Sequence, residues 1–356
     1  IYTAAERPPL SLTPVPDFYL ANLKRYSAMS VQYSRGCPFQ CEFCDIIEIY
    51  GRIPRTKSNQ QIVSELDALL KAGWRGPVFI VDDNFIGNKK NVKQMLPHLV
   101  AWSEEHRYPF SFMTEASVNL AEDEPLLDTM RSAGFRRVFL GIETPIEESL
   151  RETKKGQNLH RSLLDSVKRI HSHGLEIMAG FIVGFDSDPE DVFDRQIDFI
   201  RASKIPLAMV NLLSALPDTQ LWRRLKSEGR LLSEASGNNS DCSLNFVPKM
   251  NPVRLVEGYK QVMRTIYNPA EYYSRALDCL KEVAQSGAGS RGTTLKGDIA
   301  TLSRVVLKLG VRDPARLEFW RYIRRVLLEH RTKFARAVML AAMGYHLRKL
   351  TEEYCG

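Results

Sequence analysis

The sequence predicts an α/β fold, a partial (β/α)6 TIM-like barrel of parallel strands with a C-terminal helical appendage. Two observations predict it. Between residues 29 and 217, short runs rich in Val, Ile, Phe and Leu alternate with stretches of helical periodicity, which is the pattern of βα units repeated around a parallel sheet. Beyond residue 250 the strand-like runs stop while helical periodicity continues.

Each predicted strand is an apolar run followed by polar or turn-forming residues. The six runs are "MSVQYS" (29–34), "PVFIVDD" (77–83), "FSFMTEAS" (110–117), "RVFLGIE" (137–143), "EIMAGFIVG" (176–184) and "LAMVNLLSAL" (207–216). The helices predicted between them span 59–73, 91–106, 124–134, 159–174 and 190–203. Several end at a glycine, where a left-handed residue stops a helix. In such barrels the chemistry lies at the carboxyl ends of the strands.

The chain divides into a linker (1–27), the barrel (28–232) and a helical C-terminal domain (233–356). The barrel ends in a short amphipathic helix at 217–230. In the third part, 252–283 and 296–353 are predicted to be helical, and the Gly- and Ser-rich stretch 285–294 between them to be flexible.

Composition favours a globular cytoplasmic protein, with 44% hydrophobic and 26% charged residues in 356. No apolar run is long enough to span a bilayer, and no secretory signal is recognisable at the start. The net charge of +7 comes largely from Lys and Arg between residues 303 and 349. Because the excess of positive charge belongs to the tail, it gives little support to nucleic acid as a partner.

Three of the six cysteines lie within "RGCPFQCEFCDI", spaced C-x₃-C-x₂-C at Cys37, Cys41 and Cys44. In a reducing compartment such a cluster indicates metal ligands rather than disulfides. Thiolates select zinc or iron-sulfur clusters, and both usually take four ligands. The remaining cysteines are isolated in sequence and no His stands near Cys44. Three thiolates therefore suit a 4Fe-4S cluster with one open iron, which can bind a small chelating ligand, although zinc with a distant fourth ligand is an alternative.

This loop, placed directly after the first predicted strand, resembles the signature of radical S-adenosylmethionine enzymes. The resemblance implies a 4Fe-4S cluster whose open iron is chelated by S-adenosylmethionine. An external electron donor such as flavodoxin or ferredoxin then drives cleavage to methionine and a 5'-deoxyadenosyl radical, which abstracts hydrogen from substrate. No general acid or base is required for that abstraction, so no catalytic side chain is predicted.

The resemblance also implies cofactor contacts at the cysteine loop and at the strand ends. The aromatic before the third cysteine, Phe43, is expected near the adenine. The carboxyl and amide groups of "VDDNF" are expected to hold the methionine amino group, because carboxylates favour an ammonium donor; a polar turn capping the next helix is the alternative. These residues are Asp82, Asp83 and Asn84.

Glu115 and Glu143 end apolar strands, where an unpaired carboxylate would be costly. The resemblance implies ribose or amino contacts for both, and a structural salt bridge to a nearby arginine is the alternative. "GFIVG" supplies Gly180, Ile182 and Gly184, which are expected to pack the adenine through backbone contacts. Strand bulges are the alternative use of these glycines.

Further stretches, including "IYGRIPRTKS", "LGIETP" and "ALPDTQLWRRLKSEGRL", resemble the cobalamin-dependent radical enzymes that include the hopanoid C-2 methylases. The resemblance covers residues 14–270, and 13–26 resembles the linker that follows their cobalamin domain. It implies methylation of an unactivated carbon of a lipid or other small molecule, with cobalamin as a further cofactor. Because the chain starts at Ile1 rather than Met, we expect a fragment whose cobalamin domain would precede it.

The basic C-terminal segment has two possible structural interpretations. Residues 316–350 have the amphipathic pattern of a helix that lies on a membrane surface, which would suit a lipid substrate and peripheral membrane contact. The alternative is a helix pair packed on the barrel with a solvated basic face. For the whole chain, the alternative functions are an RNA methylthiotransferase-type radical enzyme, which usually carries a β-rich RNA-binding module, and a zinc-stabilised nucleic-acid-binding protein.

Overall fold

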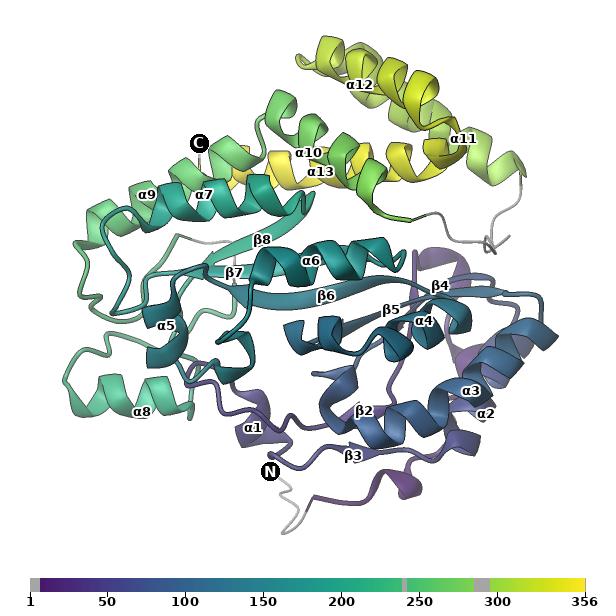
Figure 1. Ribbon diagram of the computed structural model, residues 1–356, viewed down its shortest axis with the longest axis horizontal. Coiled ribbons are helices and arrows are strands. Elements are labelled where there is room, and N and C mark those ends of the chain that lie inside the picture. The colour runs from purple at the N-terminus through teal and green to yellow at the C-terminus, as the bar shows by residue number, and fades with distance from the viewer. Residues whose placement is uncertain (1–6, 239–241, 285–294, 356) are drawn as a thin grey trace.

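The computed structural model describes residues 7–238, 242–284 and 295–355. A six-stranded sheet in the order β1-β4-β5-β6-β7-β8 forms its centre, and all neighbouring strands are parallel (Figure 1). The strands are β1 (Met29–Val31), β4 (Gly76–Ile80), β5 (Phe110–Ala116), β6 (Phe135–Glu143), β7 (Glu176–Val183) and β8 (Leu207–Leu212). The predicted α/β fold with six parallel strands is thus confirmed.

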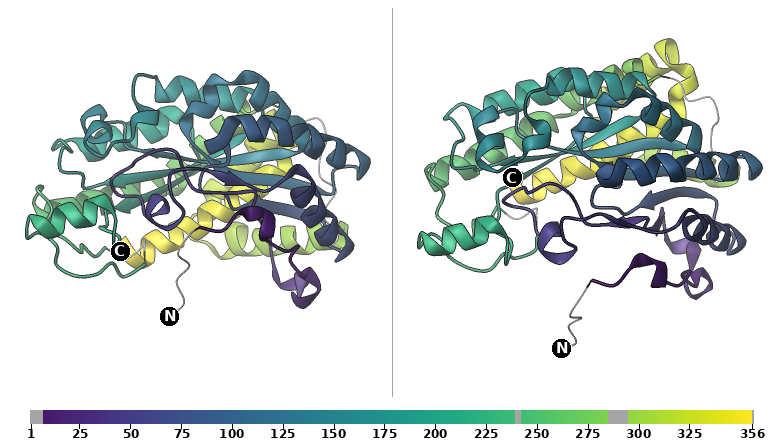
Figure 2. Two further views of the ribbon diagram at one scale, coloured as in Figure 1. Left: turned by 90° about the horizontal axis from the view of Figure 1, so that it is seen from below. Right: turned by 60° about the horizontal axis from the view of Figure 1, so that its bottom comes forward.

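Five helices connect the strands, close to the predicted ranges. They are α2 (Asn59–Lys71), α3 (Lys89–Glu105), α4 (Glu124–Ala133), α6 (Leu163–Ser172) and α7 (Val192–Ser203). Gly134 ends α4 in a left-handed conformation, with φ of 106°, as glycine allows. In both views of Figure 2 the teal helices lie above the sheet and the N-terminal segment lies below it.

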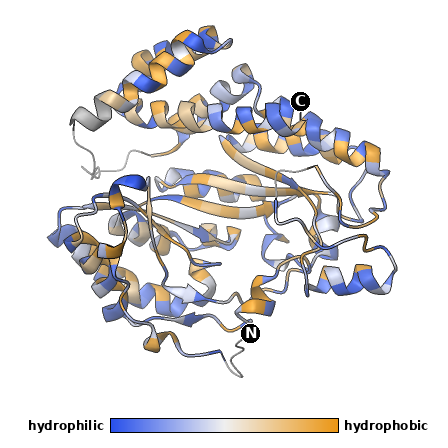
Figure 3. Cartoon of the chain, turned by 180° about the vertical axis from the view of Figure 1, so that it is seen from behind, coloured by the Kyte–Doolittle hydropathy of each residue, from blue (hydrophilic) through white to orange (hydrophobic). Residues whose placement is uncertain are grey.

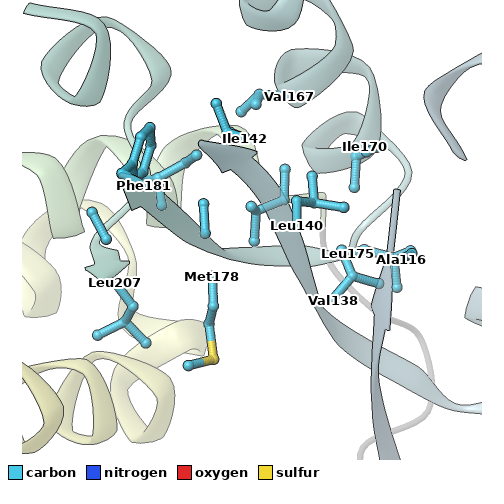
Figure 4. Packing of buried hydrophobic residues seen from close by; sticks show 14 of the residues in the cluster. Ala116, Val138, Leu140, Ile142, Val167, Ile170, Leu175, Met178, Phe181 and Leu207 are labelled. Atoms are coloured by element: carbon cyan, nitrogen blue, oxygen red, sulfur yellow. The ribbon is translucent and has the colours of Figure 1, made fainter. Parts of the chain in front are cut away.

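Side chains alternate between the two faces of the strands. Along β6, Val138, Leu140 and Ile142 are fully buried and point toward Val167 and Ile170 of α6 (Figure 4). Burying each such side chain stabilises the fold by about 1.5–3 kcal/mol. The central strands are correspondingly largely orange, the colour of hydrophobic residues, in Figure 3. The intervening positions of β6 face the other side of the sheet, where polar groups are tolerated.

The first predicted strand is too long. β1 ends at Val31, and β2 (Ser34–Arg35) pairs instead with β3 (Arg55–Thr56) in a separate antiparallel ladder. The cause is Asp82, whose carboxylate accepts hydrogen bonds from the Tyr33 backbone N–H at 2.7 Å and the Ser34 hydroxyl at 2.6 Å. Two short helices, α1 (Ile46–Ile49) and α5 (Glu147–Glu152), and strand β3 were not predicted.

The predicted C-terminal helices are present but divided. The stretch 252–283 forms two helices because Pro269 cannot continue the first and Asn268 caps the second. The stretch 296–353 is also divided, at Asp313 and again at His330, and 285–294 lies outside the described residues. The elements are α8 (Gln220–Ser227), α9 (Pro252–Ile266), α10 (Pro269–Glu282), α11 (Leu295–Val305), the π-helix η7 (Val306–Arg312), α12 (Arg316–Glu329) and α13 (Phe334–Cys355).

A buried ion triad joins α13 to the sheet. The Glu176 carboxylate of β7 accepts from Arg137 of β6 at 2.7 Å and from Arg336 of α13 at 2.6 Å. Burial alone would raise the pKa of Glu176, but the two guanidinium groups outweigh it and hold this pKa below its ordinary value. The C-terminal helices are therefore anchored to the barrel by charge as well as by apolar packing.

Candidate active site

Three cysteines share one cavity at the carboxyl ends of the strands. The cavity has a volume of about 210 Å³ and is lined by Cys37, Cys41 and Cys44, which lie between β2 and α1. Its opposite wall consists of residues from the ends of β4, β5 and β6. The structure thus brings the cysteine loop to the edge of the sheet at which βα barrels carry their chemistry.

Backbone geometry fixes where the cysteine loop begins. Gly36 adopts a φ of 100°, and a Cβ there would lie 2.8 Å from the Gly51 carbonyl oxygen. Only glycine fits this position. The Gly36 N–H donates to the Asp83 carboxylate at 3.1 Å, and the Cys37 N–H donates to the Gly51 carbonyl at 3.2 Å. These contacts direct Cys37 into the cavity.

Glu42, between the second and third cysteines, is held from three directions. Its N–H donates to the Thr153 carbonyl and its own carbonyl accepts from the Leu221 N–H, both at 2.9 Å. Its carboxylate accepts two hydrogen bonds from Arg224 of α8, at 2.6 and 3.2 Å. The central part of the loop is therefore fixed by α8 and by the segment after α5.

The sulfur atoms receive side-chain amide donors. Asn84 Nδ2 lies 3.7 Å from Cys37 Sγ, and Gln157 Nε2 lies 3.4 Å from Cys41 Sγ. Ser117 orients Asn84 by donating to its amide oxygen at 3.2 Å. Donors of this kind stabilise ligating thiolates and tune the metal they hold.

Burial raises the pKa of the Cys44 thiol to about 12, and burial likewise raises the pKa of Cys37. Iron must therefore displace protons from these thiols when it binds. Within the described part of the chain, no three His, Cys, Asp or Glu side chains converge as ligands of a single ion. Three thiols that line one cavity, with amide donors to two of them, fit the ligand set of an iron–sulfur cluster.

Two carboxylic acids line the facing wall. Asp83 and Glu115 both line the cavity, and burial followed by the charge of Asp83 raises the pKa of Glu115 to about 7. The pKa of Asp83 is also raised, again chiefly by burial. Two acids that share a desolvated wall favour a cationic ligand, because a nearby positive charge offsets both burial and mutual repulsion.

A buried ion pair completes the cavity. Lys155 Nζ donates to Glu143 Oε1 at 2.6 Å, and both side chains are almost fully buried. Burial alone would lower the pKa of Lys155, but the charge of the adjacent Glu143 carboxylate and its hydrogen bond work against burial, and this pKa is raised. Glu143 follows a register shift in β6 and has a φ of 65°. A Cβ at Gly141 would lie 2.4 Å from the Glu143 carboxylate oxygen, so the close approach of Glu143 to the backbone at residue 141 requires glycine there.

Most of the residues named from the sequence meet here. Phe43 lines the cavity with its ring centroid 5.8 Å from Lys155 Nζ. Gly180 lies beside the cavity: a Cβ there would be 3.1 Å from the ring of Phe139, which lines the cavity. Ile182 packs in the small apolar cluster that includes Phe43. The salt-bridge partner of Glu143 is a lysine rather than an arginine.

Four predicted site residues do not line the cavity: Gly180 and Ile182, described above, and Asp82 and Gly184. Asp82 is buried behind the strand end, where it binds Tyr33 and Ser34, and burial raises its pKa to about 6. Gly184 has a φ of 109° and packs against Leu255, which a Cβ would approach to 3.1 Å. Both shape the strand ends from outside the cavity.

Sequence reasoning missed several residues of the cavity. Lys155 stands next to Lys154, an exposed residue that donates to Gln220 at 2.8 Å. No periodicity in "KKGQN" distinguishes the buried lysine from the exposed one, and nothing marks Gln157. The unpredicted lining residues are Phe39, Ile46, Ala116, Ser117, Phe139, Gly141, Lys155 and Gln157.

An open parallel barrel whose C-x₃-C-x₂-C loop lines a cavity at the strand ends is the architecture of a radical S-adenosylmethionine domain. Comparison with known proteins agrees: residues 31–200 match the Radical SAM superfamily. Residues 219–356 match a domain of unknown function, DUF4070. Residues 31–200 of the chain therefore form a radical SAM domain.

Two relatives align along almost the whole chain. It is 45% identical over 99% of its length to an uncharacterized methyltransferase, sll1242, of Synechocystis. It is 36% identical over 98% of its length to the hopanoid C-2 methylase of Rhodopseudomonas palustris. The chain spans 66% of the length of each relative.

The fold is also found among solved structures. The chain is similar, with a TM-score of 0.60 and 14% identity, to the radical S-adenosylmethionine methyltransferase TsrM of Kitasatospora setae, solved with cobalamin and a [4Fe-4S] cluster bound. The match covers 92% of this chain and 63% of that one. At this identity the likeness shows a shared fold.

Proposed function

We propose that this chain performs the radical step of a cobalamin-dependent methylation. Cys37, Cys41 and Cys44 would hold a 4Fe-4S cluster at which S-adenosylmethionine is cleaved reductively. The 5'-deoxyadenosyl radical would abstract hydrogen from an unactivated carbon of a lipid or other small molecule, which methylcobalamin then methylates. The observation that carries the proposal is the sharing of one buried cavity by three thiols, two acids with raised pKa values and a buried lysine.

The remaining lining residues bind and orient the cofactor in this proposal. Asp83 and Glu115 attract its positively charged amino end, and Phe43 packs against the adenine. Lys155 places a positive charge beside Cys41 and Cys44, which stabilises their thiolates. Glu143 holds Lys155 in that position.

Gly180 and Ile182 supply the strand face on which the adenine rests. Asn84 donates to a cluster thiolate rather than to the cofactor. Asp82 and Gly184 act indirectly, by shaping the strand ends.

The names of the relatives support methyl transfer, and the helical C-terminal domain favours it over the RNA methylthiotransferase alternative. The match of residues 31–200 to an enzyme superfamily also argues against the alternative of a zinc-stabilised nucleic-acid-binding protein. We further propose an acidic one-electron donor, flavodoxin or ferredoxin, as partner, and peripheral contact with a membrane that supplies a lipid substrate. Among the described residues, no helix is long and apolar enough to cross a bilayer.

Anaerobic reconstitution tests the radical step. The chain should bind about four irons, absorb broadly near 400 nm, and form 5'-deoxyadenosine from S-adenosylmethionine when a strong reductant is added. Replacing Cys37, Cys41 or Cys44 with Ala should abolish both iron loading and product. Cys242→Ala, in a partly exposed cysteine outside the cavity, is the matched control. The proposal would be refuted if the protein were colourless and bound zinc, or if a variant at one of these three cysteines still formed 5'-deoxyadenosine.

A further inference from the structure

A second cavity lies in the C-terminal helical domain, outside the site described above. It has a volume of about 540 Å³ and lies between the π-helix η7 and α13. Four of its lining side chains are cationic: Arg304, Lys308, Arg312 and Lys349. Its volume lies in the range of pockets that hold small ligands.

The positive charge of this cavity is largely uncompensated. Among the described residues, Arg304, Lys308 and Arg312 have no carboxylate within ion-pair distance, whereas Lys349 pairs with the exposed Glu352. The one acid that lines the cavity, Asp313, is buried and already bound by Arg348. Like charges held together repel one another unless a counter-charge lies between them.

The backbone and an aromatic ring hold the cations together. Arg304 at the end of α11 and Lys308 and Arg312 of the π-helix follow one another at steps of four residues. Residues four apart lie near one face of an α-helix, and the same holds in a π-helix, whose hydrogen bonds join residues five apart. The Tyr345 ring also lines the cavity, with Lys308 Nζ 5.1 Å and Lys349 Nζ 5.8 Å from its centroid. These cation–π contacts orient both ammonium groups before any ligand arrives.

The π-helix is itself fixed by α12. Trp320 Nε1 donates to the Gly310 carbonyl at 2.9 Å, and a Cβ at Gly310 would lie 2.9 Å from the Trp320 ring. A side chain at residue 310 would push the two helices apart. The wall that carries the cations is therefore a packed element rather than a loose surface turn, and π-helical segments are often found at functional sites.

We propose that this cavity binds an anion that carries phosphate or pyrophosphate. A phosphate group presents several oxygens to the forked guanidinium donors of the cavity, and this holds for a diester with one negative charge as well as for a monoester or pyrophosphate with more. The anion can be a free phosphorylated compound or the headgroup of a phospholipid. Exposed Leu307 and Val311, which directly precede Lys308 and Arg312, provide an apolar rim that would suit a phospholipid headgroup.

Binding to the reconstituted full chain tests the proposal and is independent of radical chemistry. Sodium pyrophosphate is titrated by calorimetry at an ionic strength of about 0.15 M, where weak surface electrostatics are screened. In parallel, the chain is sedimented with vesicles of phosphatidylglycerol or of phosphatidylcholine. Whichever probe the native chain binds, pyrophosphate or phosphatidylglycerol vesicles, the double variant Arg304→Gln with Lys308→Gln should bind it about tenfold more weakly.

The control variant, Arg324→Gln with Arg325→Gln, removes the same charge from α12 outside the cavity. It should leave binding unchanged within about twofold. Selective weakening of pyrophosphate binding identifies a free phosphate ligand, and selective weakening of phosphatidylglycerol binding identifies a headgroup. Failure of both probes to bind, or equal weakening by both double variants, would overturn the proposal. Unchanged iron content in both variants separates this result from failure of the radical site.

Discussion

Glu42 and Arg224 join the cysteine loop to α8, the last helix of the barrel, by a two-pronged ion pair, at 2.6 and 3.2 Å. Arg224 also donates to Asp186 at 2.9 Å. The Glu42 side chain is only 8% exposed, so its carboxylate depends on this partner. Because Glu42 lies between two of the three cysteines, Arg224 acts as a positioning residue for the loop.

Arg224→Gln should therefore disturb the loop. Leaving a nearly buried carboxylate unpaired costs about 3 kcal/mol, and we expect a changed electron paramagnetic resonance signal of the reduced cluster together with lower iron content. Arg224→Lys should restore part of the signal. The neighbouring Arg223, which is exposed and pairs with Glu48 at 2.6 Å, provides the control Arg223→Gln. An unaltered signal in Arg224→Gln would show that the pair does not position the loop.

Glu115 should make binding of S-adenosylmethionine depend on pH. Burial, followed by the charge of Asp83, raises its pKa to about 7, so the carboxylate that attracts a cation forms only as pH rises through that value. Affinity should increase from pH 6 to pH 8 and be about tenfold weaker in Glu115→Gln at pH 8. Anaerobic calorimetry with the exposed Glu105→Gln as control measures this. The same pH dependence in both variants would contradict the assignment.

Asp82 should affect stability rather than cofactor binding. Its pKa is raised by burial to about 6 in the folded chain, against about 3.9 when unfolded. The folded state therefore binds the proton more tightly, and this stabilisation is complete below about pH 4 and lost as pH rises through 6, by up to about 3 kcal/mol. Asp82→Asn should remove that dependence and unfold at higher urea concentration than the native chain at pH 7.5.

Asp82→Ala should be less stable at every pH, because it leaves the Tyr33 N–H without an acceptor, at a cost of about 1–3 kcal/mol. Urea unfolding between pH 5 and 8 compares the three proteins. A native chain that gains stability from pH 5 to 7 while Asp82→Asn does not would contradict the raised pKa.

The triad of Glu176, Arg137 and Arg336 should govern how firmly α13 is held. Arg336→Met removes one of the two partners of a fully buried carboxylate and should cost about 3–5 kcal/mol. Amide hydrogen exchange in α13 should accelerate more than exchange in the sheet. Arg331→Met, in an exposed residue without an ion pair among the described residues, should change neither. Equal exchange in both variants would show that apolar packing alone anchors the helix.

Pattern reasoning located the sheet and the cysteine loop because both depend on local spacing. It failed where a distant side chain captures the backbone, as Asp82 does at Tyr33, and where a proline divides a periodic stretch, as at Pro269. At the site, neighbouring acids Asp82 and Asp83 follow one strand, yet only Asp83 lines the cavity. Adjacent residues of a strand point to opposite faces, and composition does not say which face is hollow. Lys155 was missed because a lysine is buried only where the fold brings a counter-charge to it, and its partner Glu143 lies on a different element.

The two edges of the sheet, β1 and β8, have a consequence for how such proteins diversify. No hydrogen-bonded ladder joins β1 to β8 among the described strands. The barrel is therefore open between these two strands, and strand pairing does not fix the distance between them. A hollow of about 110 Å³ borders the β8 edge, and its lining includes Leu212, Ser214 and Asn245. Insertions or substitutions there would change the size of this hollow without altering the ends of β4, β5 and β6, which line the cysteine cavity. Under the proposed function, that edge is where related chains could differ in the molecules they accept while keeping the same cysteine site.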